Sequence, residues 1–249
     1  MRLYGDAGII DDDGRGGNDT ITGGSASVVL IYGDADGLNG HARGGDDTLT
    51  GSATSFTINV IFGDAGTMDG DSRGGDDILV AGGVIGGFGS SLVMGDAGTM
   101  RDSARGGNDT LTGGAGSDNT LYGDARLMYD NATGGDDTLI SGAGTDHMWG
   151  DAQFINDVLA RPTADTGLLA TGADTFVFAP GSGNDDIGDF RQSDHDRIDV
   201  RAYGFSSLAD MMITFDGTST RIHFDANNSV TLVGFSDLSA LSTLDFILA

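Results

Sequence analysis

Six glycine-rich turns of this chain each end on an aspartate that stands two residues before an apolar residue. These aspartates are Asp19, Asp47, Asp77, Asp109, Asp137 and Asp174; in the first five turns a Gly-Gly pair comes before them, with Gly17, Gly45, Gly75, Gly107 and Gly135 as its second glycine. Calcium is a hard cation that takes about six to eight oxygen ligands from carboxylates and main-chain carbonyls. A glycine-rich turn exposes its carbonyls and the aspartate supplies charge, so the pattern predicts calcium binding.

A single Asp-Gly turn is common in β proteins and needs no metal to explain it. Six such turns in register with a set of apolar residues favour metal binding over that simpler interpretation. We expect a row of about five calcium ions, one between each adjacent pair of turns.

Twelve apolar residues mark the elements that must position these turns: Leu3, Ile21, Ile31, Leu49, Ile61, Leu79, Val93, Leu111, Leu121, Leu139, Met148 and Phe176. The interval from Leu3 to Ile21 is 18 residues and recurs four more times, while the alternating intervals vary. A chain with one fixed and one variable spacing winds around an axis. Each apolar residue belongs to a short strand-like stretch, in which alternate side chains point inward. We therefore predict an all-β fold: a right-handed parallel β-roll over residues 1–178 and a mostly β C-terminal cap over residues 179–249.

The turns on the variable side of this winding carry few aspartates. The stretch SGAGTDHMW at residues 141–149 contains Asp146, and GGAGSDNT at residues 113–120 places Asp118 one residue out of register. The other turns on this side have none. The variable side should therefore hold at most one or two ions, near Asp118 and Asp146.

The motifs resemble those of the RTX (repeats-in-toxin) β-roll proteins. SGAGTDHMW fits the nine-residue repeat G-G-x-G-x-D-x-U-x except at Ser141, and stretches such as GRGGNDTIT fit its Gly-x-Asp-x-U core. Residues 172–190 and 196–205 are similar to the segment that closes the β-roll of serralysin-type proteases and alginate epimerases. In this family the turn aspartates and nearby carbonyls bind calcium between adjacent turns of one side. The resemblance adds Asp185 and Asp189 to the predicted ligands.

Charge and targeting features restrict the partners and the compartment. The net charge of −26 argues against nucleic acid and anionic membranes as partners, and the chain contains no cysteine. We see neither an N-terminal secretory signal nor an apolar run long enough to span a membrane. RTX proteins leave the cell by type I secretion through a C-terminal signal, and residues 236–249 are similar to such signals. The resemblance thus implies a type I secretion apparatus as partner and a secreted, extracellular or cell-surface location in a bacterium.

Two further columns recur within an insert that begins Gly-Asp-Ala in each repeat. The GDA aspartates are Asp6, Asp34, Asp64, Asp96, Asp124 and Asp151; they could bind calcium or cap the insert, and we favour capping. The residue before each insert forms an outward stripe of Tyr4, Tyr32, Phe62, Met94, Tyr122 and Trp149. We expect apolar insert residues such as Met68, Met100 and Met128 to cover this stripe; left exposed, it would suit a protein partner or a dimer. Arg15, Arg43, Arg73 and Arg105, near so many carboxylates, should form solvated ion pairs.

The functional prediction is a secreted, non-enzymatic calcium-binding module that folds on binding calcium outside the cell. No catalytic constellation stands out, and the absence of an HExxH motif means that the protease activity of the family is not carried over. One alternative is a C-terminal export and stabilising domain of a larger secreted enzyme such as a protease, lipase or epimerase. Another is an adhesion or ice-binding surface.

Overall fold

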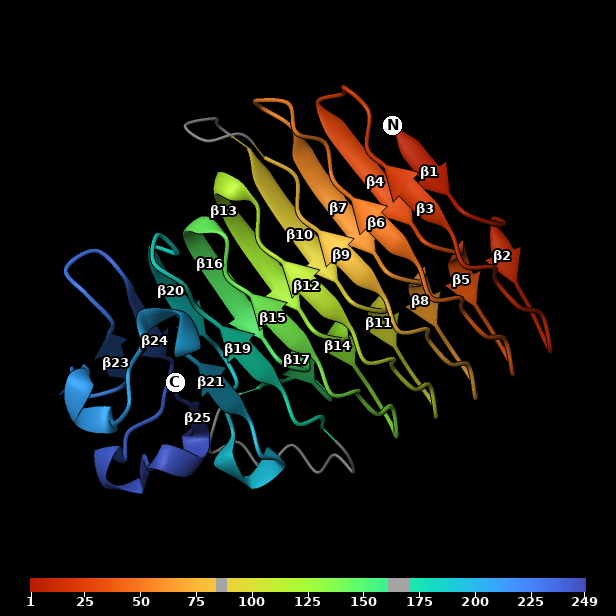
Figure 1. The fold of residues 1–249 in the computed structure, drawn as a ribbon. Helices are drawn as coiled ribbons and strands as arrows, with labels where there is room; N and C mark the ends of the chain where they lie inside the picture. Colours follow the sequence, from red (N-terminus) through yellow and green to blue (C-terminus); the bar gives the residue numbers. More distant parts are fainter. Residues whose placement is uncertain (84–88, 161–170) are drawn as a thin grey trace.

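The computed structural model describes residues 1–83, 89–160 and 171–249 and shows an almost entirely β protein, a parallel β-solenoid of about five turns. The coils lie side by side along one axis, in chain order from the N-terminal to the C-terminal end (Figure 1). No helix in the described residues is long and apolar enough to span a membrane.

The first wall of the solenoid, called here the long sheet, has ten strands. Neighbouring coils pair in parallel and in register, so Ile31 lies beside Leu3 and Ile61. In spatial order the strands are β1 (Arg2–Tyr4), β4 (Val28–Tyr32), β7 (Ile58–Phe62), β10 (Ser90–Met94), β13 (Ala115–Tyr122), β16 (Ala143–Trp149), β20 (Asn184–Ile187), β24 (Ser229–Leu232), β23 (Thr220–His223) and β22 (Met212–Phe215).

The second wall, the triplet sheet, has eight strands, most of them three residues long. Its register aligns Leu49 with Ile21 and Leu79. The strands in spatial order are β3 (Thr20–Thr22), β6 (Thr48–Thr50), β9 (Ile78–Val80), β12 (Thr110–Thr112), β15 (Thr138–Ile140), β19 (Thr175–Val177), β21 (Arg197–Asp199) and β25 (Phe246–Ile247).

The twelve apolar residues predicted to point inward do form the core between these two walls. Ten of them are fully buried, and Leu3 and Ile21 in the first coil are partly buried against the others. The residue beside each points away: Leu79 is fully buried, whereas Ile78 is 51% exposed. This alternation is what a strand with one buried face requires.

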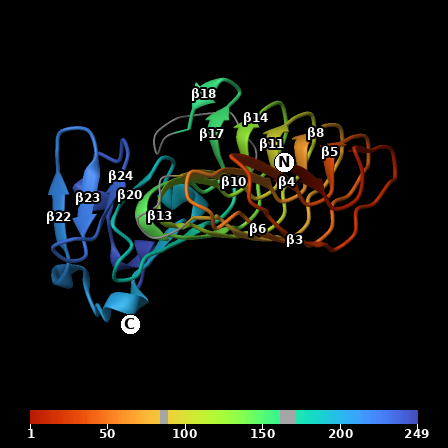
Figure 2. The same cartoon turned by 90° about the horizontal axis from the view of Figure 1, so that it is seen from above.

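The inserts build a third wall, the insert sheet, which stands off one side of the flattened coil (Figure 2). It encloses its own core of alanine, leucine, isoleucine and methionine side chains. Its strands are β2 (Ile9–Ile10), β5 (Ala35–Leu38), β8 (Ala65–Met68), β11 (Ala97–Met100), β14 (Ala125–Met128), β17 (Ala152–Ile155) and β18 (Val158–Leu159).

The outward stripe is covered within the monomer, but not by the methionines. Met68, Met100 and Met128 point into the alanine-rich core of the insert sheet. Instead, a Cβ at Gly66 would lie 3.3 Å from the ring of Tyr32, so that ring packs over the outer face of the insert sheet. Tyr32 also stacks on Tyr4 and Phe62 with 4.8 Å between ring centroids. Tyr32, Met94 and Tyr122 are buried, whereas Tyr4, Phe62 and Trp149 are half-buried.

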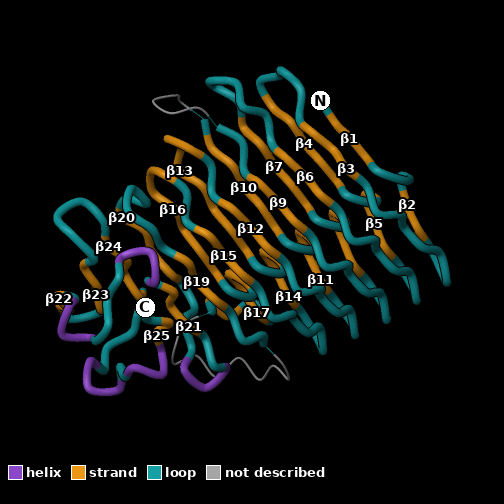
Figure 3. The backbone as a smooth tube through the Cα atoms, in the orientation of Figure 1, coloured by secondary structure: helices purple, strands orange, loops and turns teal. Residues whose placement is uncertain are grey.

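The C-terminal region continues both main walls past residue 178. Strands β20 and β24 extend the long sheet, and β21 and β25 extend the triplet sheet. Phenylalanines enlarge the shared core here, among them Phe178, Phe190 and Phe224. Short 3₁₀ turns gather at this end: η1 (Gln192–Asp194), η2 (Arg201–Tyr203), η3 (Leu208–Asp210), η4 (Leu238–Ala240) and η5 (Thr243–Asp245) (Figure 3).

Candidate metal centre

The predicted turn aspartates form one column, the turn row, at the start of the triplet-sheet strands. Each carboxylate after that of Asp19 accepts a hydrogen bond from the main-chain N–H of the preceding aspartate in the row. The N–H of Asp47 donates to Oδ1 of Asp77, and that of Asp77 to Oδ1 of Asp109, both at 2.7 Å. The same bond links the other neighbours in the row. The structure therefore brings together all six aspartates, stacked along the solenoid axis.

The second oxygen of each turn-row carboxylate is buried and has no hydrogen-bond donor within the described residues. In all of them but Asp174 this oxygen faces a main-chain carbonyl across a glycine, and in Asp174 it faces Gly150 itself. A Cβ at Gly63 would overlap both Oδ2 of Asp77 and the carbonyl oxygen of Gly95, and the same holds one coil on at Gly95. Buried oxygens that converge without a donor lose hydration without compensation. Carboxylate and carbonyl oxygens are the ligands that calcium prefers, so this donor set fits the ion.

Burial shifts the protonation of these carboxylates. Desolvation raises the pKa of Asp47 to about 7. It also raises the pKa values of Asp77, Asp109 and Asp137 well above the usual range, and repulsion from neighbouring carboxylates adds to this. Both causes disfavour the charged form. Without a cation, the row is a line of buried acids that resist ionisation.

The predicted glycines lie where consecutive coils touch. A Cβ at Gly75 would overlap the carbonyl oxygen of Gly45, and one at Gly107 would overlap that of Gly75. Their N–H groups donate to the GDA aspartates eleven residues earlier, as Gly75 does to Asp64 at 3.0 Å. Gly17, Gly45, Gly107 and Gly135 make the equivalent bond. The capping role that we favoured for the GDA aspartates is thus confirmed.

The sequence analysis missed one member of the turn row, Asp196. Its Oδ1 accepts a hydrogen bond from the N–H of Asp174 at 3.1 Å, which extends the column by one coil. It stands two residues before the buried Ile198, the same offset that identified the other aspartates. That offset could have revealed it, although no Gly-Gly pair comes before it.

On the variable side, a different column occupies the position facing the core. Sheet register aligns Asn59 with Ser91, Ser91 with Asn119, and Asn119 with Asp146. Asp118 lies one residue outside this column and its side chain is exposed. Asn119, and not Asp118, therefore occupies the buried position beside Asp146. The Asn119 amide donates to Oδ1 of Asp146 at 2.6 Å.

Asp146 continues the column into the C-terminal region. Its N–H donates to Asp185 at 3.0 Å, and Ser141 hydrogen-bonds to both carboxylates. Burial raises the pKa of both aspartates, that of Asp185 to about 7. Of the aspartates predicted on this side, the structure therefore joins Asp146 and Asp185. Asp189 lies apart from them, where it accepts hydrogen bonds from the N–H groups of Gly150 and Asp151.

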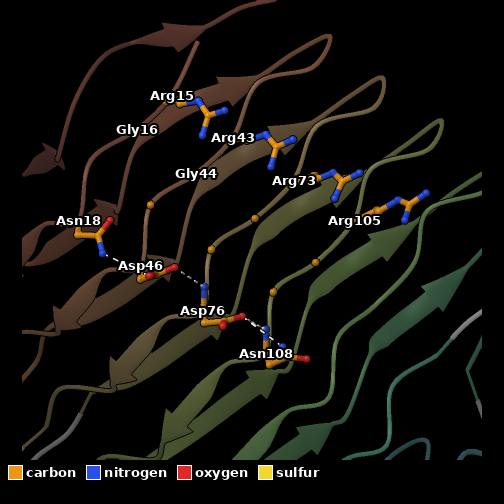
Figure 4. Close-up of a pocket in the computed structure, with 15 residues that line it drawn as sticks. Arg15, Gly16, Asn18, Arg43, Gly44, Asp46, Arg73, Asp76, Arg105 and Asn108 are labelled. Carbon is orange, nitrogen blue, oxygen red and sulfur yellow. Dashed lines mark hydrogen bonds between the residues drawn. The ribbon is translucent and has the colours of Figure 1, made fainter. Parts of the chain in front are cut away.

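A groove of about 520 Å³ runs across the outer surface of four coils (Figure 4). Arginines line one edge of it (Arg15, Arg43, Arg73 and Arg105), and Asn18, Asp46, Asp76 and Asn108 line the other. Among the described residues, these arginines form none of the expected ion pairs. The carboxylates of Asp46 and Asp76 on the opposite edge instead accept hydrogen bonds from the main-chain N–H groups of Asp76 and Asn108 in the next coil. The arginines form main-chain bridges from coil to coil, which stacks like charges.

Within the described ranges, no three His, Cys, Asp or Glu side chains gather into a metal-binding group. Any ion in the turn row would therefore draw on main-chain carbonyls beside the carboxylates. Comparison of the chain with family models, curated protein sequences and solved structures finds no match. The solenoid and its carboxylate columns are thus the basis for assigning a function.

Proposed function

We propose that this chain is a calcium-binding β-solenoid of the RTX type, whose turn row binds calcium between coils. The observation that carries the proposal is the set of six buried carboxylate oxygens without a donor, each facing the main chain at a glycine. Bound calcium would supply the positive charge that this row lacks. The role is structural, and the protein's own residues do no chemistry in it.

Calcium binding and folding are expected to be one event. The triplet-sheet strands are too short to persist alone, and the charge of −26 opposes a compact state. The turn row exists only once the chain is wound, so the free energy of binding becomes free energy of folding. Extracellular calcium modules bind at about 10⁻⁴–10⁻³ M, far above cytosolic calcium levels. The chain would stay unfolded in the cytosol, compatible with type I secretion, and fold outside.

The test is circular dichroism of the chain in chelator and then in millimolar calcium. We expect a disordered spectrum that becomes a strand spectrum when calcium is added. Magnesium at the same concentration is the control; it demands octahedral geometry and dehydrates reluctantly, so it should not replace calcium. A full strand spectrum in chelator at neutral pH would refute the proposal.

A further inference from the structure

The GDA aspartates form a second column of carboxylates, called here the GDA row. Asp64, Asp96 and Asp124 in its centre are fully buried. One oxygen of each caps the insert: Oδ1 of Asp96 accepts from the N–H of Gly107 at 2.8 Å, and Oδ1 of Asp124 from that of Gly135 at 2.7 Å. Capping therefore uses one of the two oxygens of each carboxylate.

The other oxygen of these three carboxylates, Oδ2, is buried and has no donor among the described residues. Each faces the next coil across the first glycine of a Gly-Gly pair. A Cβ at Gly74 would lie 2.5 Å from Oδ2 of Asp64 and would overlap Oδ1 of Asp96. Gly44 and Gly106 have the same position between their two carboxylates. A side chain at these glycines would fill the space between two carboxylates of successive coils.

The space lies close to solvent. Gly44, Gly74 and Gly106 line the arginine-edged groove, and the buried GDA carboxylates adjoin these glycines.

Two carboxylates that face each other in a buried place need a proton or a cation between them. Among the described residues, no salt bridge supplies a positive charge to Asp64, Asp96 or Asp124. Carboxylate oxygens that converge with a glycine main chain match the ligand preference of a hard divalent cation.

We propose that the GDA row is a second line of calcium sites, parallel to the turn row. Each site lies between Oδ2 of one GDA aspartate and Oδ1 of the next. The glycine between them lets the two carboxylates converge, because a Cβ there would overlap their oxygens. Oδ1 of each central GDA carboxylate thus has two roles, since it caps the insert and also faces the ion of the preceding site, whereas Oδ2 faces the ion of the following site. The GDA row lies beside the turn row, and one experiment separates them.

The experiment counts calcium ions bound per chain by equilibrium dialysis with elemental analysis, on the full chain and on Asp96→Asn. Asparagine keeps the shape and an oxygen for Gly107, but removes one charge from the two sites that flank Asp96. We expect the variant to lose about two ions and to keep its strand spectrum. Asp109→Asn makes the matched change in the turn row, and the exposed Asp102→Asn should leave the count unchanged.

An Asp96→Asn variant that binds as many ions as the unmodified chain would overturn the proposal. If that variant does not fold, the count for the unmodified chain decides: about five ions fit the turn row alone and overturn it, whereas about ten fit two rows. If Asp109→Asn binds as many ions as the unmodified chain while Asp96→Asn loses ions, the GDA row stands and the turn-row proposal fails.

Discussion

Individual aspartates in this solenoid are buried, which disfavours the charged form of their carboxyl groups. Burial raises the pKa values of Asp34 and Asp47 to about 8 and about 7, against 3.8 for a free side chain. Around neutral pH the folded chain thus holds protons that the unfolded chain has released. By linkage, such groups stabilise the fold fully below the unfolded pKa and lose this contribution as the pH rises through the folded pKa.

The metal-free chain should therefore fold on acidification. We expect a strand spectrum in chelator near pH 4 that is lost as the pH rises through about 6 to 8. With calcium the trend should reverse, because ions replace protons on ionised carboxylates. Circular dichroism across this range, with and without calcium, measures both profiles. A metal-free chain that is equally disordered at pH 4 and pH 8 would contradict the protonation argument.

A single substitution on the variable side tests whether an additional carboxylate creates a calcium site there. Asn119→Asp places a second acid against Asp146 and removes the amide donor between them. In chelator at neutral pH the variant should be less stable by about 1–3 kcal/mol, the cost of an unsatisfied buried group. In calcium it should bind one ion more than the unmodified chain. Asn18→Asp, on an exposed turn, is the control and should change neither quantity. An unchanged ion count in Asn119→Asp would exclude a site at this position.

At the level of sheets, both main walls follow from one spacing in the sequence. The fixed interval of 18 residues carries the chain from a core residue of the long sheet, such as Ile31, to one of the triplet sheet, such as Leu49, so the twelve apolar residues identified two sheets and their shared core. The insert sheet could not be predicted from this spacing. Its strands, such as AGTM in β8 and ARLM in β14, are at most four residues long, and the pairing between coils defines them. The expectation of arginine ion pairs was wrong for the described residues, because the carboxylates on the opposite edge form hydrogen bonds between coils that the sequence spacing does not encode.

The alternation within one triplet strand predicts a sharp difference between neighbours. Leu79→Ala should lower the free energy of unfolding in calcium by about 2–5 kcal/mol, because it opens a cavity in the core between the walls. Ile78→Ala, on the exposed face of the same strand, should change it by about 0.5 kcal/mol or less. Denaturant unfolding of both variants at saturating calcium makes the comparison. Equal losses would mean that the two faces of the triplet sheet are not distinguished as the structure has them.

Over the whole molecule, the two ends of the solenoid differ in what holds them. The coils near the N-terminal end rest on small aliphatic cores and the carboxylate rows, whereas phenylalanines pack the C-terminal end. Stability in a solenoid is approximately a sum of local terms and contacts between neighbouring repeats. The C-terminal end should therefore need less calcium to fold.

Trp149, the single tryptophan of the chain, reports on that end. Its ring lies tilted against that of Tyr122 with ring centroids 5.1 Å apart, at the coil next to the phenylalanine-rich region. In a calcium titration, its fluorescence change should come at a lower calcium concentration than the change in strand content of the whole chain. Coincident midpoints would indicate a single cooperative unit instead.

Between Asp19 and Asp137, the hydrogen bonds of the turn row connect aspartates 28, 30 or 32 residues apart, and the differences fall in the loops that lead from the triplet sheet to the long sheet. Each repeat is thus an interchangeable unit. Removing residues 48–77 would join Asp47 to Ile78 and leave every carboxylate, glycine and apolar column unbroken, one member shorter. Removing half as many residues would place loops against strands and interrupt all of them. The length of such a molecule can therefore change by whole repeats, with the number of carboxylates in each row rising or falling in step and the two ends untouched.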